Sequence, residues 1–393
     1  MKQGILTINA GSSSIKFALF SLAHPISPEA EVSGQIDGIG TNATKMVAKD
    51  KAGEKIADQM IAGEQVSHDQ AFDALLKWFM ATHAGWQIVA VGHRVVHGGE
   101  RYSQPTIVDD TVLGHLTSFI PLAPLHEPHN VAGIRALQAL LPGVPQIACF
   151  DTAFHRSQPD VAQTFGLPRA LSAEGIKRYG FHGLSYEFIA RALPQHSHRA
   201  NGRVVVAHLG NGASMAAMVN RKCVATTLGF STIDGLLMGT RCGNLDPGVI
   251  LHLMETKNLS VKDMTKMLYK ESGLLGVSGI SQDMRTLLSS NKPEAQEAVD
   301  LFCYRIAREL GSLAAASGGI DALVFTGGIG EHAAEVRRRV CLQSEWLGIR
   351  LNPEANARHD IVISAGNSSV DVLVIPTNEE WMMAHHAQTL LAL

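Results

Sequence analysis

The 393-residue chain lacks the features that mark several large classes of protein. It has only five cysteines, an odd number with no C-x-x-C pair, which argues against a disulfide framework or a zinc ribbon and favours a reducing compartment. The apolar stretch at the N-terminus is short, because polar Asn9 and Ser12–Ser14 interrupt it, so a signal peptide or membrane span is not expected. By elimination, we expect a cytoplasmic location.

Long runs of one charge are also absent, and the net charge is only −3. Because nucleic acids and membrane surfaces attract clusters of basic residues, neither is expected as a partner. Hydrophobic residues make up 46% of the chain and charged residues 18%, as in ordinary globular proteins. The length exceeds what one core usually supports, so we expect two domains that act on small molecules.

The most familiar nucleotide-binding signatures are missing. Neither G-x-x-x-x-G-K-[ST] nor H-R-D occurs, which excludes a P-loop NTPase and a protein kinase. The apolar run Val324–Thr326 leads into Gly327, Gly328 and Gly330, whose spacing is not G-x-G-x-x-G, so a Rossmann site is disfavoured. A helix that begins after such glycines still suits a phosphate or the edge of a nucleotide.

A repeated hairpin pattern is present instead. Apolar Gly4–Ile8, small and polar Asn9–Ser14, and apolar Ile15–Phe20 predict a strand, a tight turn and a second strand. The same order of residue types returns about 200 residues later in Val204–Val219. We interpret this as an internal duplication of a strand-rich α/β unit.

Strands and helices alternate along the rest of the chain, which favours an α/β protein with mixed sheets. Helices are expected at Asp69–Met80, Pro293–Ser317 and Asn378–Leu391, and strands at Val89–Val96, Asp321–Thr326 and Val370–Ile375. A Pro-rich connection precedes the strand that ends at Asp151, so a domain boundary is expected near residue 150.

Both hairpin turns have the composition of a phosphate-binding loop. The small residues of Asn9–Ser14 let backbone N–H groups approach an anion, and Lys16 can add a point charge. The second turn offers the same donors and a histidine through His208, Leu209, Gly210, Asn211 and Gly212. Either turn alone could be a plain connection between core strands. Two in one chain favour a split phosphate site with one loop from each domain.

Several charged side chains stand beside glycines or at strand ends. Arg94 lies on an expected strand that ends in Gly98-Gly99, and a buried arginine must find an anion. Asp151 follows a strand, while His182 and Arg241 lie in Gly-flanked loops. In Leu125–His129 the spacing is not H-E-x-x-H and Pro128 argues against a helix, so a zinc site is disfavoured.

Nine segments, taken in order, resemble the acetate kinase family, which belongs to the broader acetokinase and actin-like ATPase fold. They run from residue 9 to residue 380 and read NAGSSSIKF, GHRVVHGGE, PLAPLH, CFDTAFH, RYGFHG, HLGNGAS, MGTR-x-G-x-LDPG, TGGIGE and PTNEE. The resemblance implies two duplicated actin-like (ribonuclease H-like) α/β domains with mixed sheets flanked by helices and a cleft between them. The first would span residues 1–150, completed by the C-terminal helix 381–393, and residues 151–380 would carry the nucleotide site.

The resemblance also implies roles for individual residues. Asp151, His182 and Arg241 are implied as catalytic, Arg94 as the carboxylate-binding arginine with Val96 and Leu125 at the acyl pocket, and Asn9 with Glu379 as the metal-associated pair. The implied nucleotide-binding residues are Lys16, His208, Leu209, Gly210, Asn211, Gly212, Asp283, Met284, Arg285, Gly328, Ile329, Gly330, Glu331 and His332.

The reaction that the resemblance implies is acetate kinase chemistry. The γ-phosphoryl group of ATP would move reversibly and in line to acetate, giving acetyl phosphate and ADP, with Mg²⁺ as cofactor and Mn²⁺ as a substitute. A homodimer is implied as well. A carboxylate is already deprotonated at neutral pH, so it needs relief from repulsion rather than a strong base, which suits a site rich in arginine, histidine and metal.

Three alternatives remain open on the sequence. Propionate or butyrate could be the acceptor, because one methylene group changes specificity by only ~1–3 kcal/mol. An actin-like switch ATPase would release phosphate without any acid. A sugar kinase of the same fold would use Asp151 as a base, which leaves Arg94 and Arg241 without a purpose.

The chain departs from the usual family pattern at a few positions. Cys242 and Asn244 stand where Ser and Asp are common, and Thr232 stands where some members have a pocket proline. His332 and Glu127 each stand where Asn is usual. None of these changes removes an implied catalytic group.

Overall fold

The computed structural model describes residues 1–393, which divide into two compact units. Unit 1 consists of Met1–Ala153 together with Asn378–Leu393, and unit 2 consists of Phe154–Thr377. All five cysteines are free thiols. None of the helices has the length and apolar character that crossing a membrane requires.

Unit 1 is built on an eight-stranded sheet with the order β5-β4-β3-β2-β1-β6-β8-β7. Its strands are β1 (Lys2–Ala10), β2 (Ser14–Ser21), β3 (Val32–Asp37), β4 (Lys45–Asp50), β5 (Lys55–Met60), β6 (Trp86–Val95), β7 (Thr106–Ile107) and β8 (Gln146–Phe150). Its helices are α1 (His68–Thr82), α2 (Asp110–Ser118), the short 3-10 helix η1 (Ile120–Leu122), α3 (Glu127–Leu140) and α15 (Glu379–Leu391).

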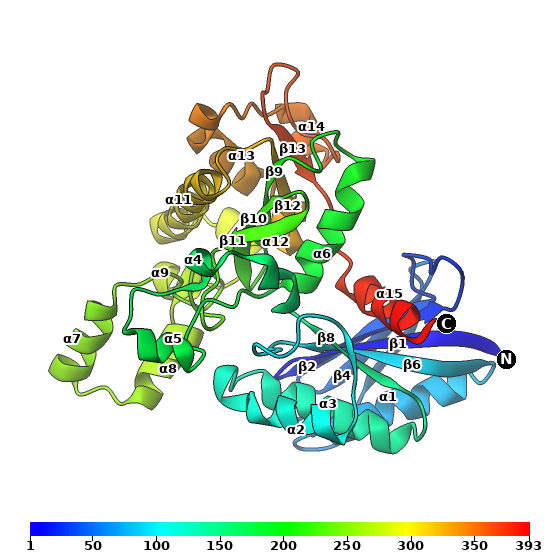
Figure 1. The fold of residues 1–393 in the computed structure, drawn as a ribbon. Coiled ribbons are helices and arrows are strands. Elements are labelled where there is room, and N and C mark those ends of the chain that lie inside the picture. Colours follow the sequence, from blue (N-terminus) through cyan, green and yellow to red (C-terminus); the bar gives the residue numbers. More distant parts are fainter. The chain divides into compact units, whose positions relative to one another are not determined.

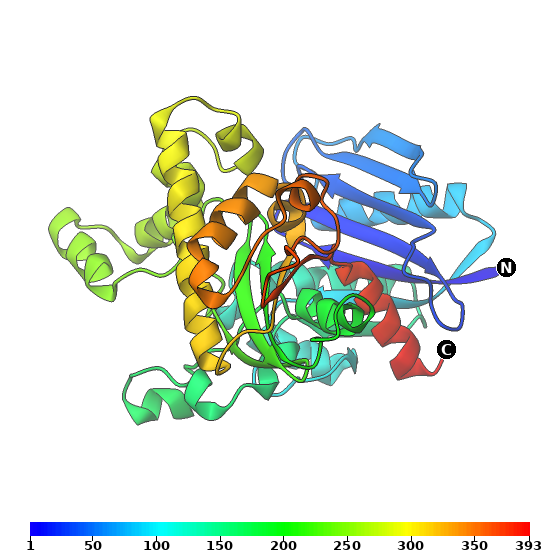
Figure 2. The ribbon, with the colours of Figure 1, turned by 90° about the horizontal axis from the view of Figure 1, so that it is seen from above.

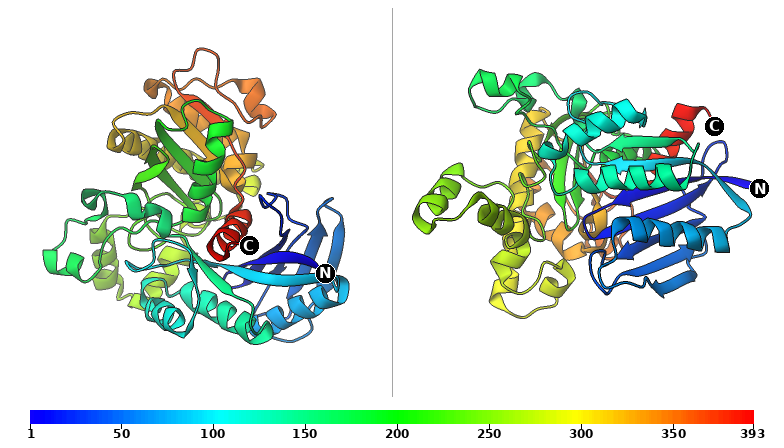
Figure 3. Two further views of the ribbon diagram at one scale, coloured as in Figure 1. Left: turned by 45° about the vertical axis from the view of Figure 1, so that its right-hand side comes forward. Right: turned by 90° about the horizontal axis from the view of Figure 1, so that it is seen from below.

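Helices cover the two faces of this sheet (Figure 1). Helix α1 begins with a capping box between Ser67 and Gln70 and buries Phe72 and Leu75 against one face. Helix α15 packs on β1 and β6 from the opposite face (Figure 3). The approach is close at Gly92, where a Cβ atom would lie 3.1 Å from Met383. The C-terminal helix thereby brings its first turn to the sheet that carries Arg94.

Unit 2 is built on a five-stranded sheet with the order β11-β10-β9-β12-β13. Its strands are β9 (Arg203–Leu209), β10 (Ala213–Val219), β11 (Lys222–Thr226), β12 (Ala322–Thr326) and β13 (Asp371–Val374). Its helices are α4 (Asp160–Gln163), α5 (Arg169–Ala173), α6 (Gly183–Ala192), α7 (Pro247–Lys257), α8 (Val261–Lys270), α9 (Gly273–Ser278), α10 (Met284–Leu288), α11 (Pro293–Ala316), α12 (Gly327–His332), α13 (Ala334–Gln343) and α14 (Pro353–Ala357). Three short 3-10 helices, η2 (Ala153–Ser157), η3 (Leu193–Gln195) and η4 (Glu345–Leu347), connect these elements.

The two sheets share one plan. In unit 1, β3, β2 and β1 pair antiparallel, and β6 and β8 then continue in parallel. In unit 2, β11, β10 and β9 pair antiparallel, and β12 and β13 continue in parallel. The long helix α11 runs along the unit 2 sheet, where it contacts β9, β10 and β11 (Figure 2). The repeated strand order is the duplication that the two hairpin patterns predict.

The predicted elements agree with the structure except in their boundaries and at one helix. Both predicted hairpins form, as β1-β2 and β9-β10. The prediction that Pro128 excludes a helix is wrong, because α3 starts at Glu127 and Pro128 occupies its first turn, where a missing N–H costs nothing. Helix α12 begins at Gly327 itself rather than after the glycines, whereas α15 (Glu379–Leu391) agrees with the predicted Asn378–Leu391 to within one residue.

Candidate active site

The centre of the unit 1 site is an ion pair between Arg94 and Asp151. Arg94 lies on β6, and Asp151 follows the parallel neighbour β8, so both stand at the same end of the sheet. Arg94 donates from Nε to both carboxylate oxygens of Asp151 at 3.1 Å and from Nη2 to Oδ2 at 2.6 Å. Asp151 is almost fully buried, at 1% exposure, whereas the Arg94 side chain keeps 20%. The buried carboxylate therefore holds the arginine in one orientation, while the arginine side chain stays partly exposed.

Asn9 and Glu379 lie around the same arginine. Arg94 Nη1 donates to Asn9 Oδ1 at 3.4 Å, at the end of β1. Burial raises the pKa of Glu379, and the neighbouring Asp151 raises it further, while Arg94 and Lys16 lower it. Burial would also lower the pKa of Arg94, but Asp151 and Glu379 together raise it. One amide and two carboxyl groups, from the end of β1, the residue after β8 and the start of α15, thus lie around the Arg94 guanidinium group.

The first turn of α3 supports the strand end that carries Arg94. Asn130 accepts from the Val96 N–H at 3.0 Å and donates to Ala10 O at 2.9 Å, which ties β6 to the first hairpin. Val96 is buried at 5% exposure, and Leu125, in the turn just before α3, is half-buried. These are the two residues predicted for the acyl pocket: Val96 is hydrogen-bonded to α3, and Leu125 lies two residues before that helix.

Glu127 is the unusual member of that turn. Its side chain is fully buried, Oε2 accepts from the His97 N–H at 3.3 Å, and Oε1 has no hydrogen-bond partner. Burial raises its pKa to about 8, and nearby Asp151 contributes to the rise. At neutral pH this carboxyl group is therefore largely protonated, which makes it a neutral substitute for an amide side chain.

In unit 2, His182 is held by a chain of hydroxyl groups. It adopts a left-handed conformation, with φ of 59°, just before α6. Its Nδ1 is 2.8 Å from Ser214 Oγ, and Ser214 Oγ is 2.5 Å from the Tyr186 hydroxyl. The His182 ring also stacks on His208, with ring centroids 4.4 Å apart. If Tyr186 donates to Ser214 and Ser214 to Nδ1, the proton on His182 resides on Nε2.

The second hairpin turn brings His182 and Arg241 together. A Cβ atom at Gly212 would lie 3.4 Å from His182 Nε2 and 3.9 Å from Arg241 Nη1, so both side chains reach the backbone of this turn. Arg241 donates from Nη1 to the Thr232 carbonyl at 2.9 Å. The absence of a side chain at Gly212 leaves space beside one imidazole and one guanidinium group, as an anionic phosphoryl group requires.

A pocket of about 490 Å³ in unit 2 collects most of the predicted nucleotide-binding residues. Its lining includes the predicted Gly210, Asn211, Asp283, Met284, Arg285, Gly328, Ile329 and His332, together with Gln282, Leu288 and Ala333. Asp283 caps α10 and pairs with Arg285 at 2.6 Å at the edge of the pocket, where the Arg285 side chain is largely exposed. The mixture of apolar walls and a few polar groups is typical of small-molecule pockets.

The remaining predicted nucleotide residues do not line that pocket. Glu331 turns inward, where Oε1 accepts from the Gly327 N–H at 2.8 Å and the Thr377 N–H at 3.2 Å. Leu209 and Gly330 are buried in the packing of α12 on β9. His208 lies behind His182, its Nδ1 2.8 Å from Ser185 Oγ, and Lys16 belongs to unit 1. Their positions suit support of the site better than contact with a base.

Sequence comparison identifies the family. Residues 4–385 match the model of the acetokinase family. The chain belongs to the acetokinase family. An acetate kinase of Rhodopseudomonas palustris is 54% identical over 392 residues, covering 98% of each chain. An acetate kinase of Clostridium botulinum is 40% identical over 403 residues, covering 98% of this chain and all of that one.

Solved structures of family members have the same fold. A crystal structure of a propionate kinase from Francisella tularensis matches with a TM-score of 0.91 and 36% identity, over 98% of this chain and 99% of the other. Acetate kinase from Porphyromonas gingivalis matches with a TM-score of 0.88 and 36% identity, over 99% of this chain and 100% of the other. The predicted fold class, two duplicated α/β units with mixed sheets flanked by helices, is confirmed. Membership also makes the chain a kinase, and kinases of this family use ATP with a divalent metal ion.

Sequence reasoning missed the residues that hold the candidate catalytic groups. Ser214 and Tyr186 lie within segments that carry the family resemblance or follow it directly, yet neither stands out by its composition. Tyr186 stands four residues after His182, one turn along α6, and this spacing is the available signal. For Asn130 there is no signal, because its bond to Val96 joins residues that are remote in sequence.

Proposed function

We propose that this member of the acetokinase family is an acetate kinase, which transfers the γ-phosphoryl group of ATP to acetate and forms acetyl phosphate and ADP. The observation that carries the proposal in the structure is the Arg94–Asp151 fork, a partly accessible arginine fixed by a buried carboxylate. The full-length similarity to curated acetate kinases supports the same acceptor.

On this proposal, unit 1 binds the acceptor. Acetate is ionised at neutral pH, and its attack on phosphorus is opposed mainly by repulsion between two anions. Arg94 neutralises the carboxylate, and Asp151 keeps the guanidinium group in place. Val96 and Leu125 would contact the methyl group. Asp151 has no need to act as a base, because its charge is already engaged by Arg94.

Unit 2 would bind the donor and stabilise the moving group. The pocket lined by Asp283, Gly328 and Ile329 would take the nucleoside, and the turn at Gly212 would face the phosphates. His182 would donate from Nε2 to a phosphoryl oxygen, while Arg241 would offset the charge that spreads over the equatorial oxygens.

We propose Mg²⁺ as the divalent ion, with Mn²⁺ as a substitute. No group of three or more His, Cys, Asp and Glu side chains able to hold a metal by themselves is found. This fits an ion bound mainly through nucleotide phosphates and one or two protein oxygens. Asn9 Oδ1 and the Glu379 carboxyl group lie around Arg94 and supply the oxygen ligands that Mg²⁺ prefers. Bound Mg²⁺ would neutralise charge on the ATP phosphates.

Further parts of the proposal are a cytoplasmic location and a homodimer, as the family resemblance implies. Residues 1–150 with the C-terminal helix would form the acceptor domain, and residues 151–380 the nucleotide domain. A propionate kinase among the structural neighbours keeps the longer acid as a second candidate acceptor. The test is ADP release from ATP and a divalent metal with and without acetate. Release that depends on acetate supports the proposal, whereas the same rate without any acid contradicts it.

A further inference from the structure

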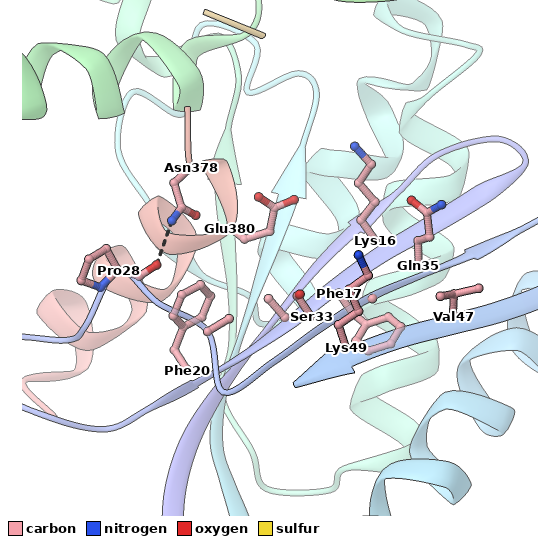
Figure 4. Close-up of a pocket in the computed structure, with 13 residues that line it drawn as sticks. Lys16, Phe17, Phe20, Pro28, Ser33, Gln35, Val47, Lys49, Asn378 and Glu380 are labelled. Carbon is pink, nitrogen blue, oxygen red and sulfur yellow. Dashed lines mark hydrogen bonds between the residues drawn. The ribbon is translucent and has the colours of Figure 1, made fainter. Parts of the chain in front are cut away.

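Unit 1 contains a second pocket, of about 560 Å³, on the same face of the sheet as α15 and beside the first turn of that helix. Its floor comes from β2, β3 and β4, and its wall from the first turn of α15 and the loop at Pro28. Figure 4 shows Lys16 and Lys49 rising from the sheet beside the Glu380 carboxyl group. Phe20 and Val47 supply apolar surface beside the charged groups, whereas the Phe17 ring packs against Trp78 on the opposite face of the sheet.

The lysines of unit 1 fall into two groups. Five have partners: Lys45 and Lys55 pair with Asp58, Lys51 with Glu29 and Glu31, Lys77 with Asp73, and Lys2 lies over the Trp86 ring. The other two are Lys16 and Lys49, which make no ion pair or hydrogen bond. Both line this pocket. The lysines outside the pocket therefore all have partners. Inside it Lys49 has none, and Lys16 has only the nearby charges of Glu379 and Glu380, without an ion pair or hydrogen bond.

The sheet register sets the spacing of the two cations. Lys16 is opposite Gln35 on β3, and Lys49 is opposite Ser33, two residues along the same strand. The two lysines thus share one face, two strands apart and two residues out of step, so their Cα atoms lie roughly 12 Å apart by strand geometry. Two long, flexible side chains at this spacing can close on one small anion from both sides.

The only acid in the lining is Glu380. The two lysines therefore outnumber the acids of the lining by one. The pocket as a whole is positive, with a polar Gln35 and Ser33 between the lysines and an apolar floor.

We propose that this pocket is a binding site for a small organic dianion, a dicarboxylate or a phosphate monoester, held between Lys16 and Lys49. One consequence rests on the proposed function. Lys16 is also a candidate contact for the ATP phosphates, so a dianion in the pocket competes for that ammonium group. The occupied pocket therefore raises the KM for ATP and leaves kcat unchanged.

The binding test uses calorimetry without nucleotide, at constant ionic strength, with succinate and glycerol 3-phosphate as probes. The key variant is Lys49→Gln, since Lys49 is exposed and has no part in the proposed reaction. The matched control is Lys45→Gln, which removes one positive charge from the same strand. Both probes can also visit the acceptor or phosphate sites, so the difference between the two variants identifies the pocket.

We expect wild-type protein to bind one or both probes with Kd of about 1 mM or tighter, Lys49→Gln to weaken binding at least about tenfold, and Lys45→Gln to leave it unchanged. Binding of one probe alone tells a dicarboxylate site from a phosphate site. No binding to wild type, or equal losses in the two variants, overturns the proposal. If binding depends on Lys49 but neither probe raises the KM for ATP, only the competition with ATP is contradicted.

Discussion

Asp151 holds Arg94 through three contacts, with Nε 3.1 Å from each carboxylate oxygen and Nη2 2.6 Å from Oδ2. This relationship joins two parallel strands at the end of one sheet, and the Arg94 side chain stays partly exposed. Replacing Asp151 and replacing Arg94 should have different effects. The comparison separates binding of the acid by Arg94 from support of Arg94 by Asp151.

Asp151→Asn should remove the charge that orients Arg94. Because Arg94 then lies partly buried without its carboxylate, we expect kcat/KM for acetate to fall roughly 10²–10³-fold and stability to fall by about 3–5 kcal/mol. Steady-state kinetics and urea unfolding measure the two effects. Asp234→Asn, which breaks a more exposed pair with Arg178, is the control and should leave acetate kinetics nearly unchanged. Equal kinetic effects in both variants would contradict the role of Asp151.

Arg94→Lys keeps the charge but loses the planar fork. Since lysine provides a single point charge, we expect the KM for acetate to rise about tenfold or more while the KM for ATP changes little. Arg94→Ala should abolish most acetate-dependent turnover. An unchanged KM for acetate in both variants would show that another residue binds the acid.

Ser214→Ala should disturb His182 without touching substrate. It removes the hydroxyl that lies between His182 Nδ1 and the Tyr186 hydroxyl, so we expect kcat to fall roughly tenfold and its pH profile to shift, with little change in either KM. Tyr186→Phe tests the same chain one step further out and should have a smaller effect. A kcat and pH profile like those of wild type in Ser214→Ala would mean that the hydroxyl chain does not set the tautomer of His182.

The two adjacent glycines that begin α12 offer a matched pair. Gly328 lines the unit 2 pocket, and a Cβ atom added there would meet no other atom within 4 Å, so Gly328→Leu should raise the KM for ATP about tenfold with little loss of stability. Gly327 has φ of 76°, and a Cβ atom there would lie 2.8 Å from the Leu209 carbonyl oxygen. Gly327→Ala should instead cost about 1–3 kcal/mol of stability. An unchanged KM for ATP in Gly328→Leu would place the nucleotide elsewhere.

Glu127 makes stability depend on pH in a definite direction. Its ordinary pKa of 4.5 applies to the unfolded chain, and burial, helped by Asp151, raises the pKa to about 8 in the folded protein, despite the hydrogen bond from the His97 N–H. Between these values the folded chain keeps a proton that the unfolded chain has lost, so stability falls as pH rises. Glu127→Gln removes this dependence. The gain in melting temperature of Glu127→Gln over wild type should therefore grow between about pH 5 and pH 8 and then level off. A constant difference would contradict the buried, protonated carboxyl group.

Hairpin patterns and apolar periodicity are enough to predict the two hairpins, the parallel strands β6, β8, β12 and β13, and the helices α1, α11 and α15. They leave β3, β4, β5, β7 and β11 unpredicted. Local composition is also enough to single out Arg94, Asp151, His182 and Arg241, because each stands at a strand end or between glycines. The contacts that orient these side chains cannot be predicted from the sequence. Asp151 meets Arg94 across 57 positions of sequence, and Ser214 meets His182 across 32, so only the folded sheets bring them together.

The error at Pro128 has a different cause. Proline disrupts a helix in its interior, but in the first turn its missing N–H removes no hydrogen bond. The sequence alone does not show that α3 begins just before Pro128. The same helix start buries Glu127 and places Asn130 against Val96. Because no helix is predicted at this place, the support of the acceptor site by Asn130 cannot be predicted either.

Trapping the product with hydroxylamine tests the central claim most directly. The purified protein is incubated with ATP, Mg²⁺, hydroxylamine and acetate, propionate or butyrate, and acyl hydroxamate and ADP are measured together. We predict hydroxamate in equal amounts to ADP, most of it with acetate, none without Mg²⁺, and almost none in Arg94→Ala. ADP formation without hydroxamate from any acid would contradict acyl phosphate synthesis by this chain.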